Sequence, residues 1–332
     1  MPLEDEQFTK WRRRPTIFIA NAWYLMAAAG QTIVGYVAVF IVQLIALFGV
    51  SISGGALTHL ANTAYEIGIL GLPVIIYAAQ HEGVSQSMRL NRPRLDMTLY
   101  AALAAITGVL LSNNLGTWWM LLIEKLGGRL YFSAIPAPTT PSELMTSILL
   151  VGIVPGVCEE LFFRGGLMGA WERRGTQQAL FITTVLFTML HASLLGLPTQ
   201  LLMGAVLGYV LLLSDSLYVS MLYHSIHNSF LLVLAYMNPG DASAQYGSLS
   251  AYIGMETGYS ALIASTAMTA VLFLTVISLM TAAHRRQGKK IEQITEGDKE
   301  PMNWQELIVL IAGVMTVCVM YINDFLRVCG AE

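Results

Sequence analysis

The sequence predicts an all-α fold, a polytopic bundle of about nine transmembrane helices. Its 332 residues are 55% hydrophobic and only 12% charged, whereas about a quarter of the residues of an ordinary soluble domain are charged. Several apolar stretches reach the length of about 20 residues that a helix needs to cross a bilayer. Only helices satisfy their own backbone hydrogen bonds in lipid at such lengths. The sequence therefore indicates an integral, multi-pass membrane protein.

Nine hydrophobic segments are expected to span the membrane. The first is much longer than a signal-peptide core of about 7–15 residues, so we expect it to remain as an anchor. With the amino end in the cytoplasm, 14 of the 18 Lys and Arg residues fall on the cytoplasmic side, where basic residues collect. The carboxyl end is then outside. The expected spans are residues 22–50, 60–79, 97–123, 143–170, 177–195, 198–213, 217–236, 259–283 and 304–325.

Polar and proline-rich linkers divide the chain into three predicted parts. Residues 1–131 hold an amino-terminal cytosolic segment and three transmembrane helices. Residues 132–237 hold four central helices, which we interpret as a catalytic core, because they carry the polar residues described below. Residues 238–332 hold an outer loop, two transmembrane helices and a charged inner loop.

The expected partners are membrane lipids and a membrane-associated molecule. A net charge of −3 with no arginine-rich tract gives no indication of nucleic-acid binding. Three scattered cysteines are too few for a disulfide framework. The glycine pairs Gly152/Gly156 and Gly204/Gly208 fit close approach of neighbouring helices, although this spacing is common in membrane proteins.

Charged residues inside the fourth span are the first sign of function, because each costs several kcal/mol in lipid. Glu160 and Arg164 are four residues apart with the acid first, which favours an ion pair on a helix. Glu159 projects about 100° away, so it is free to face a cavity and is the candidate general base. A buried ion pair that only fixes the helix register is the structural alternative. A second adjacent carboxylate argues against it.

Two further spans carry imidazole and amide groups. His191 follows Phe187 by one turn in the fifth span, and His224 and Asn228 share a face of the seventh span, with His227 close by. These groups would allow peptide hydrolysis. Glu159, helped by His191, would deprotonate a water molecule, and His224 and Asn228 would donate hydrogen bonds to the oxyanion.

The three motifs resemble those of the CAAX-protease and bacteriocin-processing family of membrane peptidases, over about residues 143–236. The resemblance implies a helical membrane core with a cavity facing the cytosol, and a glutamate endopeptidase acting on a membrane-associated peptide or protein, lipidated or not. It also implies that Glu159 and His191 activate water and that His224 and Asn228 stabilise the oxyanion. Glu160 and Arg164 would support them. We expect no cofactor or metal. The motifs are Glu159-Glu160-x-x-x-Arg164, Phe187-x-x-x-His191 and His224-x-x-x-Asn228.

Other functions remain open from the residues alone. Glu159, His191 and His224 are a possible ligand set for a zinc peptidase, although no His-Glu-x-x-His helix occurs. Cys158 allows a thiol mechanism, but a lone cysteine in an apolar helix is usually a small filler. A transporter would be expected to have inverted repeats, which are not visible. A non-catalytic immunity or scaffold protein would keep the motifs for folding.

The remaining polar residues receive structural interpretations. Glu66 is expected near an outer helix end and Asp215 in a short inner turn, both solvated. Trp118 and Trp119 are expected in an interface belt or in helix packing. The terminal Cys329 does not begin a prenylation motif, because Gly330 is not aliphatic.

Overall fold

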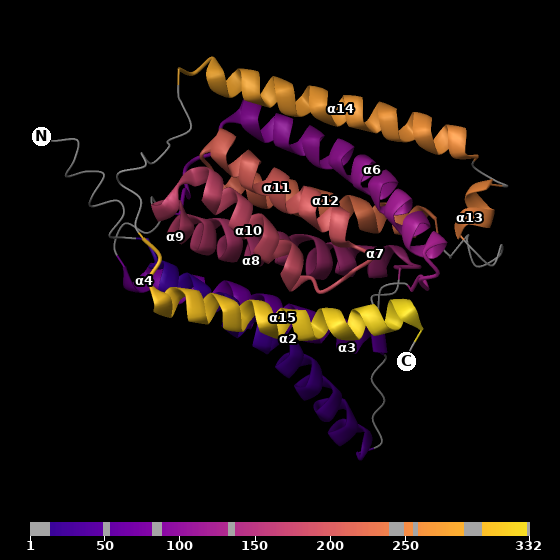
Figure 1. Ribbon diagram of the computed structural model, residues 1–332, viewed down its shortest axis with the longest axis horizontal. Coiled ribbons are helices and arrows are strands. Elements are labelled where there is room, and N and C mark those ends of the chain that lie inside the picture. The colour runs from indigo at the N-terminus through magenta and orange to yellow at the C-terminus, as the bar shows by residue number, and fades with distance from the viewer. Residues whose placement is uncertain are drawn as a thin grey trace, which may run out of the picture.

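In the computed structural model, all regular secondary structure of the described residues is helical, and no strand occurs among them. The predicted all-α bundle is therefore confirmed. Figure 1 shows most of the long helices lying side by side, from α14 on one flank to α2 and α15 on the other. The described residues are 14–48, 54–81, 88–131, 137–238, 249–254, 258–288 and 301–330.

Eight helical stretches among these residues are long and apolar enough to cross a membrane. The chain is thus an integral, multi-pass membrane protein, and the stretches agree with the predicted spans to within a few residues. They are α2 (Ile17–Ala46), α3 with η1 and α4 (Gly54–Tyr65, Glu66–Gly71 and Leu72–Gln80), α6 (Leu95–Lys125), the stretch from α7 to η4 (Pro141–Arg174), α11 (Leu197–Ser214), α12 (Leu217–Met237), α14 (Tyr259–Arg285) and α15 (Trp304–Cys329). A short α13 (Leu249–Tyr252) precedes α14.

The fourth stretch changes its helical pitch several times. Two π-helical segments flank the α-helical turn that holds Glu159 and Glu160, and π-helical turns occur frequently at functional sites. The segments are α7 (Pro141–Ser147), η2 (Ile148–Ile153), α8 (Val154–Glu160), η3 (Leu161–Met168), α9 (Gly169–Trp171) and the 3₁₀ turn η4 (Glu172–Arg174).

Prolines explain the position of two π-helical segments. Pro73 follows η1 and Pro155 follows η2 by one residue. Proline has no N–H and its ring clashes with the carbonyl four residues earlier, so an ordinary α-helical turn is disfavoured there. A wider turn relieves this clash, and each π-helical segment precedes its proline.

The fifth predicted span is a shorter helix than expected. α10 (Thr176–Leu190) has 15 residues, which rise about 22 Å, whereas the hydrocarbon of a bilayer is about 30 Å thick. The predicted span 177–195 was too long at its end, because the helix stops before Ala192, which has a positive φ of 44°. Leu194 in the turn that follows contacts Trp119 and Asp324 near the far ends of α6 and α15. The chain therefore crosses the bundle at α10 as well.

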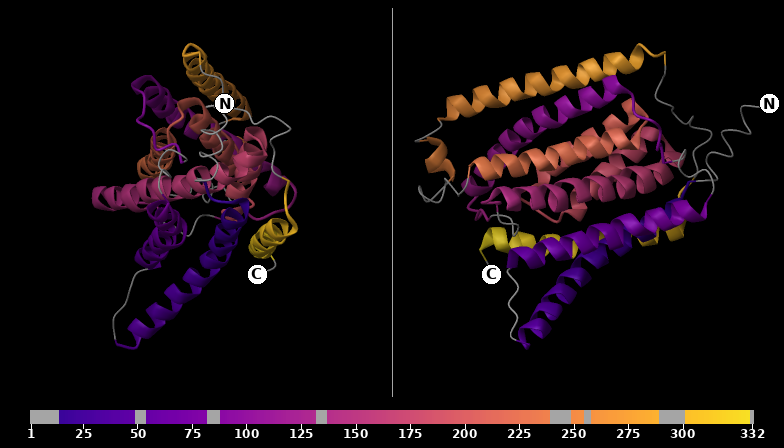
Figure 2. Two further views of the ribbon diagram at one scale, coloured as in Figure 1. Left: turned by 90° about the vertical axis from the view of Figure 1, so that its left-hand side faces the viewer. Right: turned by 180° about the vertical axis from the view of Figure 1, so that it is seen from behind.

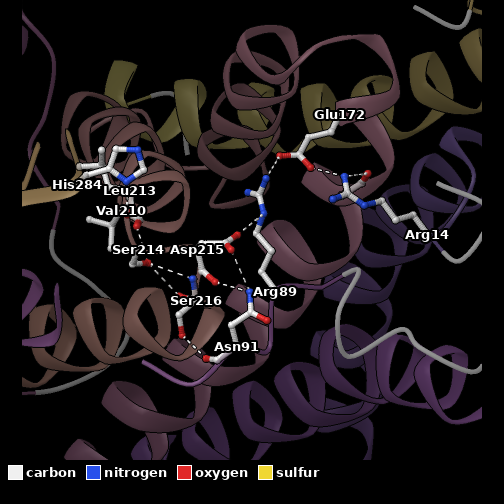
Figure 3. A network of polar contacts seen from close by, with 11 residues as sticks. Arg14, Arg89, Asn91, Glu172, Val210, Leu213, Ser214, Asp215, Ser216 and His284 are labelled. Carbon is white, nitrogen blue, oxygen red and sulfur yellow. Dashed lines mark hydrogen bonds and ion pairs between the residues drawn. The ribbon is translucent and has the colours of Figure 1, made fainter. Parts of the chain in front are cut away.

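A charged network holds one end of the bundle together (Figure 3). Arg14, just before α2, and Arg89, in the turn before α6, both form ion pairs with Glu172 in η4. Arg89 also lies 3.3 Å from Asp215 in the turn between α11 and α12. The Asp215 side chain is 54% exposed, as predicted for a solvated turn. The nine-pass order predicts that these helix ends lie on the same side, and these contacts agree with it.

Contacts at the opposite end agree with the same order. Tyr131, after α6, donates a hydrogen bond to Asp324 near the end of α15. The Leu249 N–H of α13 donates to Glu124 near the end of α6 over 2.9 Å. Figure 2 shows from behind that α13 and the end of α15 lie at the same end of the bundle. Which end faces the cytoplasm stays a prediction from the basic residues.

The predicted glycine pairs do mark close helix contacts. A Cβ on Gly152 or Gly156 would collide with the hydroxyls of Ser229 and Ser225 on α12. The space beside Gly204 and Gly208 of α11 is similarly filled by side chains of α10, namely Thr184, Phe187 and Leu180. The four central helices are thus locked to one another where the polar motifs lie.

The two tryptophans of α6 take part in helix packing. Trp118 donates its ring N–H to the Thr266 hydroxyl of α14 over 3.0 Å, and Trp119 donates to the Leu194 carbonyl over 2.8 Å. Both bonds are made to neighbouring parts of the protein. Of the two interpretations of these residues, the structure supports helix packing.

Candidate active site

The centre of the site is α8, which places two adjacent carboxyl groups inside the bundle. Glu159 and Glu160 are its last two residues, and their exposures are only 8% and 0%. α8 packs against α12 on one side and against η1 on another. Neither carboxyl group is turned toward the acyl chains.

The Glu160 carboxylate accepts hydrogen bonds from three neighbouring side chains. Arg164 donates to it over 2.9 Å and Ser220 over 2.5 Å. His224 forms a third bond through Nδ1 over 3.0 Å. The predicted ion pair between Glu160 and Arg164 is present, and the second guanidinium nitrogen of Arg164 donates to the Gly204 carbonyl over 2.9 Å. Glu160 therefore links α8 to α12 and η3.

Glu159 is buried without such a set of partners. Its Oε2 has no hydrogen bond within the described part of the chain. The nearest basic atom is Nε2 of His224, at 4.0 Å, which is beyond hydrogen-bond distance. The two neighbouring acids thus differ in their hydrogen bonds, since Glu160 is paired and Oε2 of Glu159 is not.

The bond to Glu160 fixes how His224 is presented. A carboxylate only accepts hydrogen bonds, so the Nδ1 atom of His224 carries the hydrogen of the bond to Glu160. Nε2 then points toward Glu159. In the neutral ring this atom has a lone pair, and in the charged ring it is a donor. Glu160 is in this way a positioning group for His224.

His191 lies at the end of α10 and is the most accessible of the predicted site residues. Its Nδ1 donates to the Phe187 carbonyl over 2.9 Å, because a carbonyl can only accept. Nε2 is left for other contacts. The Phe187 ring joins the motifs, since its centroid lies 4.6 Å from the ring of His191, 6.0 Å from that of His224 and 4.6 Å from the Arg164 guanidinium. No hydrogen bond joins His191 to Glu159 among the described residues.

Asn228 lies one turn beyond His224, as predicted, and is partly buried. Its amide donates to the Val151 carbonyl over a long 3.4 Å. Val151 is four residues before Pro155, which has no N–H to offer that carbonyl. Asn228 therefore joins α12 to η2 close to this proline, and one N–H of its amide takes no part in this contact.

His227 lies on another face of α12. Its ring stacks on Tyr223, with the centroids 6.0 Å apart. The Tyr223 hydroxyl occupies the space beside Gly108 of α6, where no Cβ would fit. His227 thus shares a face with Tyr223, while His224 is bonded to α8.

Two residues of the site were not recognised in the sequence. Ser220 precedes His224 by one turn, so its helical spacing could have suggested it. Glu66 was expected to be solvated, and this prediction was wrong, because its exposure is 8%. The helix begins at Gly54, not at residue 60, so Glu66 is central in it. Its carboxyl group lies within hydrogen-bond reach of Glu159.

The alternative chemistries have less geometric support. No group of three His, Cys, Asp or Glu side chains suited to holding a metal occurs in the described part of the chain, so Glu159, His191 and His224 do not meet as a ligand set. Cys158 is buried and its sulfur fills the space beside Gly71. It behaves as a packing residue between α8 and η1.

The comparison with protein families identifies the central helices. Residues 141–230 match the family model described as Type II CAAX prenyl endopeptidase Rce1-like. The predicted resemblance is confirmed. This Rce1-like segment runs from the first residue of α7 into α12 and contains all three motifs. It associates the chain with a family of proteases, which are hydrolases of internal peptide bonds. No curated protein and no solved structure matches the chain.

The match covers only part of the chain, so some helices and one residue of the site lie outside it. It begins after α6, so the helices α2 to α6 lie outside it. Glu66 belongs to this unmatched part, although it reaches the matched segment in space. Its role has to be argued from the structure of this chain.

Proposed function

We propose that this protein is an intramembrane endopeptidase in which Glu159 and His191 activate the hydrolytic water. The observation that carries the proposal is the difference between two adjacent buried acids. Glu160 accepts three hydrogen bonds, whereas Oε2 of Glu159 has no partner among the described residues. A buried carboxyl oxygen without a partner costs free energy, and a water molecule during catalysis is the partner that would explain it.

The reaction follows from the roles of the side chains. Glu159 takes a proton from water, and the new hydroxide forms a bond to the scissile carbonyl carbon. His191 orients the same water through Nε2, because its Nδ1 is held by the Phe187 carbonyl. When the carbon–nitrogen bond breaks, the proton passes from Glu159 to the leaving amine. The side chains end in their starting states.

Two donors are proposed for the oxyanion. His224 donates from Nε2 in its charged form, since its Nδ1 is already bonded to Glu160. Asn228 donates the N–H that Val151 does not use. Loss of one such donor in a protease costs about 3–4 kcal/mol of transition-state stabilisation.

The proposed substrate is a membrane-associated peptide or protein. The site is buried among spanning helices, so the scissile bond has to come from a chain that lies in or on the membrane. The matched family is described as acting on prenylated chains, and we extend to this protein only the requirement for membrane association. Lipidated and unlipidated peptides of the same sequence are therefore both tested.

The experiment measures cleavage of such a peptide library by the purified protein in lipid nanodiscs. We expect Glu159→Gln and His191→Ala to lower kcat by about 10²–10⁴-fold, while Glu306→Gln, at the start of α15, keeps full activity. A strong chelator should have no effect. Full activity of Glu159→Gln would refute the proposal in favour of a non-catalytic role for the motifs, and chelator-sensitive cleavage would favour a zinc peptidase.

A further inference from the structure

Glu66 places a third acidic group beside the two of α8. It is the first residue of η1, in the middle of the helical stretch from Gly54 to Gln80, and its exposure is 8%. η1 packs closely on α8, since a Cβ on Gly71 would lie 3.2 Å from the Cys158 sulfur. The Glu66 side chain is therefore enclosed by protein and faces α8.

Among the described residues, the charged group that lies against Glu66 is another acid, Glu159. The Glu66 carboxyl group lies beside that of Glu159, and Oε2 of each residue has no hydrogen-bond partner in the described part of the chain. The other titratable groups close to Glu66 are Tyr65 on its own stretch and Cys158 on α8. Tyr65 donates to the Ala27 carbonyl over 3.1 Å, so its hydroxyl hydrogen is committed elsewhere.

The cations of the site are already bound to another acid. Arg164 is paired with Glu160 at 2.9 Å, and Nδ1 of His224 is bonded to the same carboxylate. Nε2 of His224 is 4.0 Å from Glu159, too far for a hydrogen bond. The charge of an ionised Glu159 therefore needs a different donor.

We propose that Glu66 is a positioning residue that shares one proton with Glu159. Two carboxylates in contact in a low-dielectric interior do not both ionise, and one of them keeps a proton. The proton lies on Glu66, which donates it in a hydrogen bond to the ionised Glu159. This inference rests on the proposed function only for its catalytic consequence.

The shared proton stays between Glu66 and Glu159 throughout the proposed reaction. Glu159 gains the proton of the attacking water and later gives it to the leaving amine, while the proton of Glu66 stays in place. Glu66 keeps the pair at a single negative charge and aims the free oxygen of Glu159 at the water. It does not touch the substrate.

Infrared spectroscopy of the full-length protein in nanodiscs tests the shared proton without any substrate. We expect a carbonyl band from a protonated carboxyl group near neutral pH that shifts in D₂O. Glu66→Gln should remove this band, and Glu143→Gln, which replaces an exposed acid in α7, should leave it unchanged. Absence of the band from the wild-type protein, or its persistence in Glu66→Gln, would overturn the inference. A band that behaves as expected in a protein without peptidase activity would leave the proton sharing intact and refute the proposed function.

Activity measurements test the positioning role. Glutamine still donates to Glu159 through its amide, so Glu66→Gln should retain activity within a few-fold of wild type. In the wild-type protein we expect activity to decrease at high pH, where the shared proton is lost, and this decrease should be absent from Glu66→Gln. Glu66→Ala leaves Glu159 without a donor, and we expect kcat to fall by about 10²-fold with little change in KM. Thermal unfolding shows whether each variant is folded. Equal activities of folded Gln and Ala variants, with an unchanged pH profile, would show that Glu66 only fills space. If the Ala variant does not fold, the pH profile of Glu66→Gln decides alone.

Discussion

Two polar networks are built into this bundle, and they differ in how completely their acids are paired. At the end of the bundle that holds the charged network of Figure 3, Glu172 has one arginine on each side, Arg14 and Arg89. In the middle of the bundle, Glu160 is equally well paired, but its neighbour Glu159 has an oxygen without a partner in the described part of the chain. Pairing offsets the cost of burying a charge. The comparison therefore separates a network that joins helices from a group that we propose to be available for a reaction.

Glu159→Gln should give the largest effect on function and little effect on stability. It removes the base but no ion pair, so we expect kcat to fall by about 10²–10⁴-fold at an unchanged thermal unfolding temperature. The check is to measure cleavage and unfolding on the same nanodisc preparation. A marked loss of stability would mean that Glu159 is a structural acid like Glu172.

Glu172→Gln should have the opposite profile. It leaves Arg14 and Arg89 without their carboxylate, and breaking a buried pair costs about 3–5 kcal/mol. We expect a lower unfolding temperature and unchanged kcat per folded molecule. If the activity fell by a larger factor than the amount of folded protein, the two networks would be coupled.

Asp324→Asn tests whether α15 contributes to the position of His191. Asp324 accepts bonds from Tyr131 and from the Leu194 N–H, three residues after His191. A hydrogen bond to a charged group contributes about 1.5–3 kcal/mol. We expect a moderate loss of stability together with a kcat reduced by up to about 10-fold, a smaller reduction than His191→Ala should cause. An unchanged kcat would show that the turn keeps its shape without Asp324.

Asn303→Ala should have the smallest effect and serves as a reference that belongs to neither network. Asn303 and Glu306 form a capping box at the start of α15, and loss of an N-cap costs about 1 kcal/mol. Stability should fall slightly and cleavage should stay at the wild-type level. A larger change in cleavage would indicate that α15 transmits strain to the site.

The fold could be predicted largely because lipid restricts the possible structures. Long apolar segments in lipid must be helices, and the basic residues predicted which helix ends lie on the same side. The lengths were less certain. α10 is shorter than its apolar pattern, because Ala192 adopts a positive φ that ends the helix, and hydropathy does not contain that information.

The polar motifs were also visible in the sequence, because charges inside apolar segments are rare. Spacing on a helix predicted the ion pair of Glu160 with Arg164 correctly. It did not show that His227 packs beside Tyr223, away from the His224 bond to α8, since that depends on the contact of α12 with α6.

Glu66 was missed for a related reason. The first turns of its helix, from Gly54 onward, are only weakly apolar, so the predicted span began too late and left the acid near an end. The proline at position 73 was a usable signal, because it is placed after a π-helical turn just as Pro155 is.

The shortness of α10 makes bilayer thickness relevant to this protein. Fifteen residues rise several Å less than the surrounding hydrocarbon is thick. The lipid next to α10 has to thin, or the polar turn that begins at His191 stays submerged below the headgroups, and each Å of such mismatch costs free energy. Acyl chain length is thus expected to change the depth of the turn after α10 below the headgroups, and with it the surroundings of His191.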